Sequence, residues 1–220
     1  MIVYHFSWDL TAFGFAHFDI FGDPAWVWFA KSIAGLILLV MGVSQALAEA
    51  RGFRPGPFFK RLAIVSACAA LVSVGTYFVD PGTFVYFGIL HHIALASVLL
   101  VGLLRLPTVA LAGLTLFALA APWFLTLPQF TPNLLAWTGV TPHHPPAVDL
   151  VPLFPWFGIV LAGVVLGRTI PQTPLWATAA TWSPSNALSR LCKVAGIHSL
   201  LIYMAHQPIL FGSLWLVANL

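Results

Sequence analysis

The stretch FVYFGILHHIALASVLLVGLL, residues 84–104, carries no formally charged side chain. An α-helix rises about 1.5 Å per residue, so roughly 20 apolar residues cross the hydrocarbon core of a bilayer, which is about 30 Å thick. The stretch is therefore long enough to span a membrane. It also holds two adjacent histidines, His91 and His92, where ionisable side chains are costly.

The composition of the whole chain supports the same class of protein. Of its 220 residues, 60% are hydrophobic and 7% are charged, and the mean hydropathy is +0.95. A soluble domain has about a quarter charged residues, so 9 basic and 6 acidic side chains cannot cover a water-soluble surface. A net charge of +3 over this length is no phosphate-binding stripe, and we expect no nucleic-acid partner.

Further apolar runs of similar length predict a bundle of helices. With residues 84–104 they make six full spans, the others being residues 25–48, 62–79, 106–127, 150–167 and 194–220. The first stretch, MIVYHFSWDLTAFGF, is too short to span, and we interpret it as the second half of a helix that begins before Met1. The prediction is an all-α, polytopic transmembrane helix bundle, with six full spans and a partial N-terminal helix in one domain over residues 1–220.

Basic residues indicate which ends of these spans face the cytoplasm, because lysine and arginine collect in short cytoplasmic loops. All but Lys31 fall on one side: Arg51, Arg54, Lys60, Arg61, Arg105, Arg168, Arg190 and Lys193. We therefore expect a multi-pass membrane protein whose longest external loop is residues 128–149. Two adjacent histidines in that loop, His143 and His144, are interpreted as ordinary loop residues rather than metal ligands.

Three predicted helices place histidines inside the membrane. His5 lies about 15 Å from the external surface, His91 about 10 Å below it, and His206 about 18 Å above the internal end of its span. Asp9 follows His5 by one helical turn, so its carboxylate could orient the imidazole ring. These residues predict a buried polar cavity under the external surface. For His91 and His206, a plain hydrogen bond between helices is an equally good interpretation.

Five strings in order resemble one known family. They are MIVYHFSWDL, LVMGVSQALAEARG, FGILHHIALASVLL, PWFGIVLAGVVLGR and IHSLLIYMAHQPIL. Together they resemble the bacterial heparan-α-glucosaminide N-acetyltransferase catalytic-domain-like proteins, a branch of the transmembrane acyltransferases. The resemblance covers nearly the whole chain.

The resemblance implies a multi-pass enzyme of the bacterial inner membrane. It would move an acyl group, with acetyl as the expected one, from cytosolic acyl-CoA to a sugar or similar acceptor on the external face. In the wider acyltransferase group a histidine ends the first helix motif about ten residues after an arginine. His5 matches that histidine, and the arginine would lie before Met1. His17 is the nearest positional match to the catalytic histidine of the lysosomal enzyme, and it could equally be a solvated loop residue.

Residue chemistry is consistent with acyl transfer, because imidazole can act as a base or as a nucleophile near neutral pH. We expect His5 to be the base or acyl acceptor, with Asp9 stabilising its imidazolium and with His91 and His206 lining the cavity. Cytoplasmic basic residues could attract the phosphates of acetyl-CoA. Alternatively, they only determine the orientation of the helices in the membrane. These residues are Arg51, Arg54, Lys60, Arg61 and Arg168. No metal is expected.

Three alternatives remain open at the level of sequence. A proton-coupled solute transporter would use His5, Asp9, His91 and His206 as a relay instead of a catalytic site. A haem protein would use opposed histidines as axial ligands. A non-catalytic remnant is the third. The expected partners are membrane lipid, acyl-CoA and a carbohydrate or similar acceptor, and homo-oligomerisation is left open.

Overall fold

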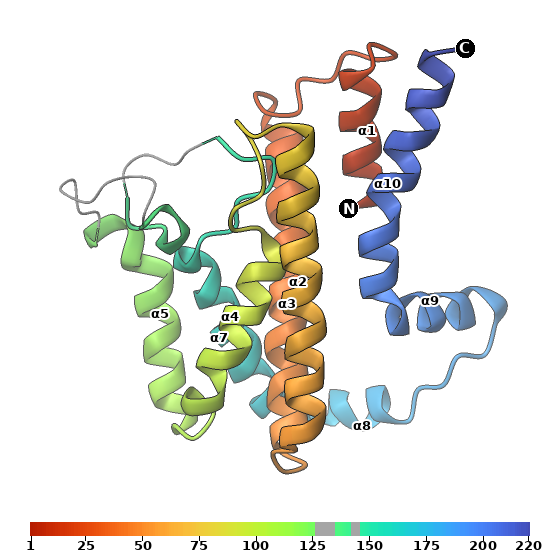
Figure 1. Ribbon diagram of the computed structural model, residues 1–220. Coiled ribbons are helices and arrows are strands. Elements are labelled where there is room, and N and C mark those ends of the chain that lie inside the picture. The colour runs from red at the N-terminus through yellow and green to blue at the C-terminus, as the bar shows by residue number, and fades with distance from the viewer. Residues whose placement is uncertain (126–134, 142–145) are drawn as a thin grey trace. The chain divides into compact units, whose positions relative to one another are not determined.

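The computed structural model describes residues 1–125, 135–141 and 146–220, and the predictions for His143 and His144 lie outside them. The described residues are helical apart from connecting segments and one isolated β-bridge (Figure 1). They form two compact units. We call Met1–Ala34 with Ala177–Leu220 the terminal unit, and Gly35–Trp176 the central unit. The all-α prediction is confirmed, and each unit is described by itself.

Among the residues that the structure describes, four helical segments are long and apolar enough to cross a membrane. They are α2 (Pro24–Glu49), α3 (Pro55–Val79), α7 (Leu153–Thr169) with the turn η2 (Ile170–Gln172) that continues it, and α10 (Ser199–Ala218). The turn from α2 to α3 needs Gly52, whose φ of +89° lies in the left-handed region that glycine adopts without strain. Proline starts α3, where its fixed φ suits the first helical turn.

Two of the predicted spans are shorter than expected, so the count of six full spans is not confirmed. The helices α4 (Ile89–Leu103) and α5 (Thr108–Phe124) have 15 and 17 residues. Residues 84–88 are not helical, and Gly88 caps α4 in an extended conformation. Pro107 sets the start of α5 because its own backbone is extended.

Extended residues ahead of α4 pair with the segment that leads into α7. Phe87 and Leu150 form an isolated parallel bridge, and the N–H of Val151 donates to the carbonyl of Phe87 at 3.1 Å. The N–H of Ile89, at the first position of α4, donates to Oδ2 of Asp149 at 3.0 Å. An acidic group at a helix N-terminus satisfies a donor that the helix itself leaves free. This pairing is why the predicted span 84–104 loses its first residues as helix.

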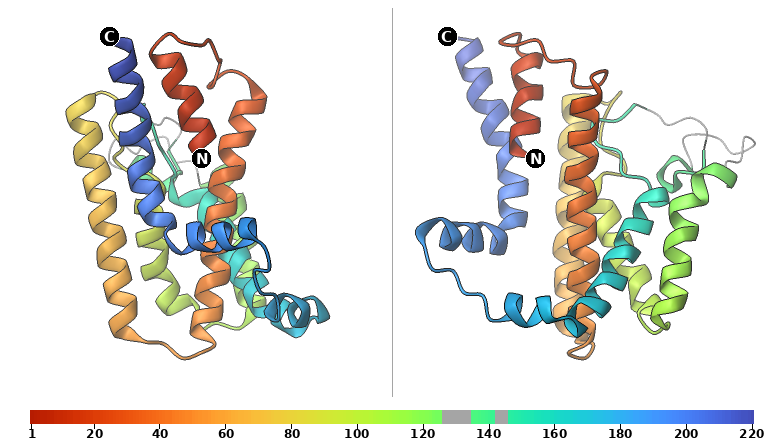
Figure 2. Two further views of the ribbon diagram at one scale, coloured as in Figure 1. Left: turned by 90° about the vertical axis from the view of Figure 1, so that its right-hand side faces the viewer. Right: turned by 180° about the vertical axis from the view of Figure 1, so that it is seen from behind.

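In the terminal unit the chain consists of α1 (Ile2–Ala12), the start of α2, α9 (Ala187–Ile197) and α10, while α8 (Pro174–Ala180) crosses the boundary between the units. The predicted span 194–220 is wrong at its start, because the helix breaks at His198 and α10 begins only at Ser199. Figure 2 shows α1 beside α10, and α9 running crosswise to α10.

Glycines allow α2 and α7 to approach closely in the central unit. A Cβ on Gly42 would lie 2.0 Å from the carbonyl oxygen of Val160, and one on Gly163 would lie 2.2 Å from that of Leu39. Neither contact tolerates a side chain, because the obstructing atoms belong to the backbone. Small residues at helix crossings are a common way to pack helices in membranes. On its other side α7 packs against α5, with Gly158 facing Leu119.

We predict that Gly163→Ala lowers the unfolding free energy by about 1–3 kcal/mol, the usual effect of adding an atom to a packed contact. The matched control is Gly113→Ala, where an added Cβ meets nothing within 4 Å. That change should leave stability equal or higher, since alanine favours helix over glycine. Thermal unfolding in detergent measures both variants, and equal midpoints would show that the close approach of α2 and α7 is absent.

Candidate functional site

A pair of histidines joins α1 to α10 in the terminal unit. The ring centroids of His5 and His206 are 4.9 Å apart, in an edge-to-face arrangement. Nδ1 of His206 lies 2.6 Å from the carbonyl oxygen of Tyr203. A carbonyl only accepts, so Nδ1 carries the proton and the neutral ring keeps its lone pair on Nε2. His206 is only 8% exposed, and its Nε2 is buried without a hydrogen-bond partner.

Directly after His206, Gln207 joins the same two helices through Asp9, which lies one helical turn after His5. Nε2 of Gln207 donates to Oδ1 of Asp9 at 2.8 Å, and the Asp9 side chain is fully buried. We predicted from the sequence that Asp9 orients His5, but the hydrogen-bond partner of the Asp9 carboxylate is Gln207. Gln207 was not among the predicted site residues. The available signal was an amide side chain directly after His206 in an uncharged span.

Three buried acceptor atoms on α1 and α10 have no hydrogen-bond partner among the described residues. Besides Nε2 of His206, they are Oδ2 of Asp9 and Oε1 of Gln207, all buried. Leaving a buried acceptor unpaired costs about 1–3 kcal/mol. A site lined by such atoms suits a group that donates hydrogen bonds, such as a hydroxyl or an amine.

His91 has a different role in the central unit, where both of its ring nitrogens are engaged. The N–H of Gly88 donates to Nδ1 at 3.2 Å, so Nε2 carries the proton and donates to Oγ of Ser73 at 3.1 Å. The Ser73 hydroxyl in turn donates to the carbonyl of Val85 at 2.6 Å. No lone pair is left to accept a substrate proton. This geometry favours the interpretation of His91 as a residue that holds the start of α4 against α3.

Two further histidines are accounted for by contacts with the backbone. His92 is fully buried, and its Nδ1 lies 3.2 Å from the carbonyl of Val151, which ties α4 to the start of α7 and leaves Nε2 without a partner. His17 lies in the exposed connection between α1 and α2, with Nδ1 2.8 Å from the carbonyl of Ala16. Its predicted role therefore gains no support from the geometry around it.

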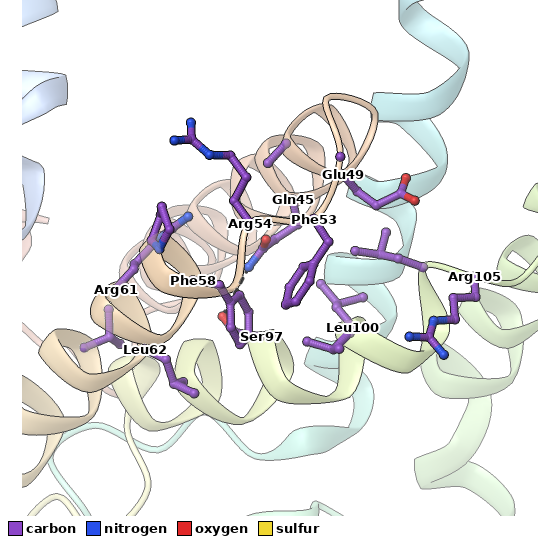
Figure 3. A pocket seen from close by; sticks show the side chains of 16 residues that line it. Gln45, Glu49, Phe53, Arg54, Phe58, Arg61, Leu62, Ser97, Leu100 and Arg105 are labelled. Carbon is purple, nitrogen blue, oxygen red and sulfur yellow. Dashed lines mark hydrogen bonds between the residues drawn. The ribbon is translucent and has the colours of Figure 1, made fainter.

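A pocket of about 300 Å³ lies in the central unit where α2, α3 and α4 end or begin (Figure 3). Arg54, Arg61 and Arg105 line it together with one acid, Glu49. Phe53 and Phe58 add apolar walls, and the amide of Gln45 donates to Oγ of Ser97 at 3.4 Å on one side. The pocket therefore combines a positive rim with an apolar interior.

The five basic residues predicted to attract acetyl-CoA separate into three groups. Arg54 and Arg61 line the pocket, and Arg51 and Lys60 are exposed outside it. The guanidinium of Arg168 donates to the carbonyls of Leu104 and Leu106, where it holds the turn between α4 and α5. Arg105 was missed as a binding residue, although it belongs to the same predicted cytoplasmic set.

The match to a family model decides the relationship of the chain to known proteins. Residues 1–208 match the model described as "Heparan-alpha-glucosaminide N-acetyltransferase, catalytic". The chain belongs to this family. The matched range of this heparan-alpha-glucosaminide N-acetyltransferase family includes the histidine pair, Asp9, Gln207 and the pocket. No curated protein and no solved structure matches the chain.

The arrangement of the histidines bears on whether the site could hold haem or a metal ion. Haem ligation by opposed imidazoles needs space for a porphyrin between the rings, and the direct contact of His5 with His206 leaves none. In the described residues, no three side chains among histidine, cysteine, aspartate and glutamate gather in a way that could hold a metal ion. The expectation that the protein uses no metal stays a prediction.

We predict that His91→Ala lowers the unfolding free energy by about 1–2 kcal/mol, because the Gly88 N–H and the Ser73 hydroxyl lose their partner. The acyl-transfer rate of the protein that remains folded should not change. Ser73→Ala should act in the same direction, since it breaks the same chain of bonds. Unfolding in detergent and a rate per folded molecule measure the two effects. A stable His91→Ala variant without activity would instead make His91 catalytic.

Proposed function

We propose that the chain is a membrane acetyltransferase in which Nε2 of His206, beside His5, takes the proton of the acceptor. The observation that carries this proposal is a buried imidazole nitrogen that has a lone pair and no partner in the protein. Membership of the heparan-alpha-glucosaminide N-acetyltransferase family supports the reaction class, and supports acetyl-CoA as donor and a carbohydrate as acceptor in general terms.

Acyl transfer from a thioester needs a base beside the acceptor group that attacks the thioester. The acceptor oxygen or nitrogen attacks the thioester carbonyl and a new C–O or C–N bond forms, while the C–S bond breaks and CoA leaves as a thiolate. The proton released by the acceptor goes to Nε2 of His206, and the contact with His5 offers a second imidazole to share it. Oδ2 of Asp9 and Oε1 of Gln207 would hold further donor groups of the acceptor.

For the donor we propose the pocket of the central unit. Arginines bind phosphate oxygens strongly and with defined geometry, and Arg54, Arg61 and Arg105 supply three guanidinium groups there. Phe53 and Phe58 provide the apolar surface that the organic parts of CoA need. The pocket has room for part of such a molecule. We also propose that the acceptor is modified on the external face of a bacterial inner membrane, while homo-oligomerisation stays a prediction.

We predict that His206→Ala and His5→Ala each lower kcat about 100-fold or more, the usual contribution of a positioned base. The measurement is transfer of labelled acetyl from acetyl-CoA in proteoliposomes, with panels of amino sugars and neutral sugars as acceptors. The control is His198→Ala, which changes an exposed histidine at the break before α10.

Undiminished transfer in His206→Ala would overturn the assignment of the base. Solute flux by the unaltered protein without consumption of acetyl-CoA would favour the proton-coupled transporter, which would use the same buried side chains. Each variant must first show normal membrane insertion and a normal thermal midpoint.

A separate prediction concerns the donor. Arg54→Gln and Arg61→Gln should each raise the KM for acetyl-CoA about tenfold, because a charge-assisted hydrogen bond contributes roughly 1.5–3 kcal/mol, and kcat should stay the same. Arg51→Gln and Lys60→Gln remove the same charge from exposed positions outside the pocket and serve as matched controls. Equal effects in all four variants would show only a general attraction by the charged surface.

A further inference from the structure

The helix α9 has an apolar face that the protein leaves uncovered. Leu188, Leu191 and Val194 recur at every third position, and they are 70%, 64% and 53% exposed. This spacing places them along one side of a helix. None of the eleven residues of α9 is buried. An apolar stripe of this kind in water would be a site of aggregation, so it needs a covering partner.

Charge identifies the kind of partner. Arg190 and Lys193 lie on the same helix outside the apolar stripe, and the sequence contains no acidic residue after Asp149. The segment around α9 is therefore positive without any internal compensation. Trp182, 64% exposed, lies just ahead of the helix, and tryptophan is enriched at the headgroup level of membranes.

The direction of the helix supplies a second, independent observation. Within the terminal unit, α9 runs crosswise to α10 in all three views, and the two helices are separated only by the break at His198 (Figures 1 and 2). Since α10 is long and apolar enough to cross a membrane, a helix attached crosswise to its first turn lies along the membrane plane. Amphipathic helices with basic flanks occupy this position in many peripheral proteins.

We propose that α9 is an interfacial helix that binds the anionic phospholipid headgroups of the cytoplasmic leaflet. Its leucines and Val194 enter the acyl-chain boundary, and Arg190 and Lys193 contact the phosphates. Basic side chains near an anionic surface gain from its negative potential. The proposal does not depend on the acyltransferase reaction, because α9 contributes no residue to the histidine pair or to the pocket.

The experiment uses the full chain in vesicles of phosphatidylcholine, with and without phosphatidylglycerol. In a Cys68→Ser and Cys192→Ser background, Ser189→Cys carries a nitroxide label on the polar side of α9, about 160° around the helix from Leu191. In the same background, the label is moved in turn to Leu188→Cys, Leu191→Cys and Val194→Cys. Collision with oxygen reports lipid, and collision with a water-soluble nickel complex reports water.

In phosphatidylglycerol vesicles we expect the three apolar positions to lose nickel accessibility and gain oxygen accessibility relative to Ser189→Cys. The double change Arg190→Gln with Lys193→Gln should remove the difference between the two lipid compositions. Arg51→Gln with Lys60→Gln removes equal charge from exposed positions elsewhere and should leave that difference intact.

Three results would overturn the proposal. Nickel accessibility at all positions would place α9 in water. Shielding of the apolar positions from both reagents would show that protein covers them, either another segment of this chain or a second copy. Identical behaviour in the two lipid compositions would remove the anionic headgroup as the partner.

Discussion

The hydrogen bond from Gln207 to Asp9 is the interaction on which the candidate site depends. It joins the first and last helices of the terminal unit at 2.8 Å, and it satisfies one oxygen of a fully buried carboxylate. A carboxylate buried in apolar surroundings is tolerated only with such partners. The same bond fixes the register of α1 against α10, so that His5 and His206 meet one turn away. Oδ2 of Asp9, Nε2 of His206 and Oε1 of Gln207 have no hydrogen-bond partner, so the site can accept hydrogen bonds from a bound group.

The contrast with the central unit shows why partners, and not residue types, identify a site. His91 was predicted to line the cavity or to make a plain hydrogen bond between helices, and Arg168 to attract acetyl-CoA or to set the topology. Each directs its nitrogens at the protein itself. Their hydrogen bonds hold the two ends of α4 in place. In His206 only Nδ1 is hydrogen-bonded to the protein, to the carbonyl of Tyr203, and Nε2 has no hydrogen-bond partner. A buried histidine with one nitrogen engaged is oriented and still able to accept a proton, which is what a general base requires.

The sequence was sufficient to predict the membrane class, the helical architecture and the family, because these depend on long apolar runs and on motifs in order. It did not predict the shortened α4, since the pairing of Phe87 with Leu150 joins segments far apart in the chain. It missed the break at His198 because residues 194–220 carry no formal charge, so the end of α9 and the spanning helix α10 form one continuous apolar run. It also did not predict the partner of Asp9, because Gln207 lies at the other end of the chain.

The contact between α1 and α10 can be tested most directly without any assay of activity. In a chain with Cys68→Ser and Cys192→Ser, His5→Cys and His206→Cys are combined, and a protease site is placed in residues 181–186. Disulfides form only between cysteines that lie close together. After oxidation and cleavage, we expect the two fragments to stay joined until reductant is added, whereas His17→Cys with His206→Cys should give separate fragments. Separate fragments from the first pair would contradict the contact on which the proposed function is built.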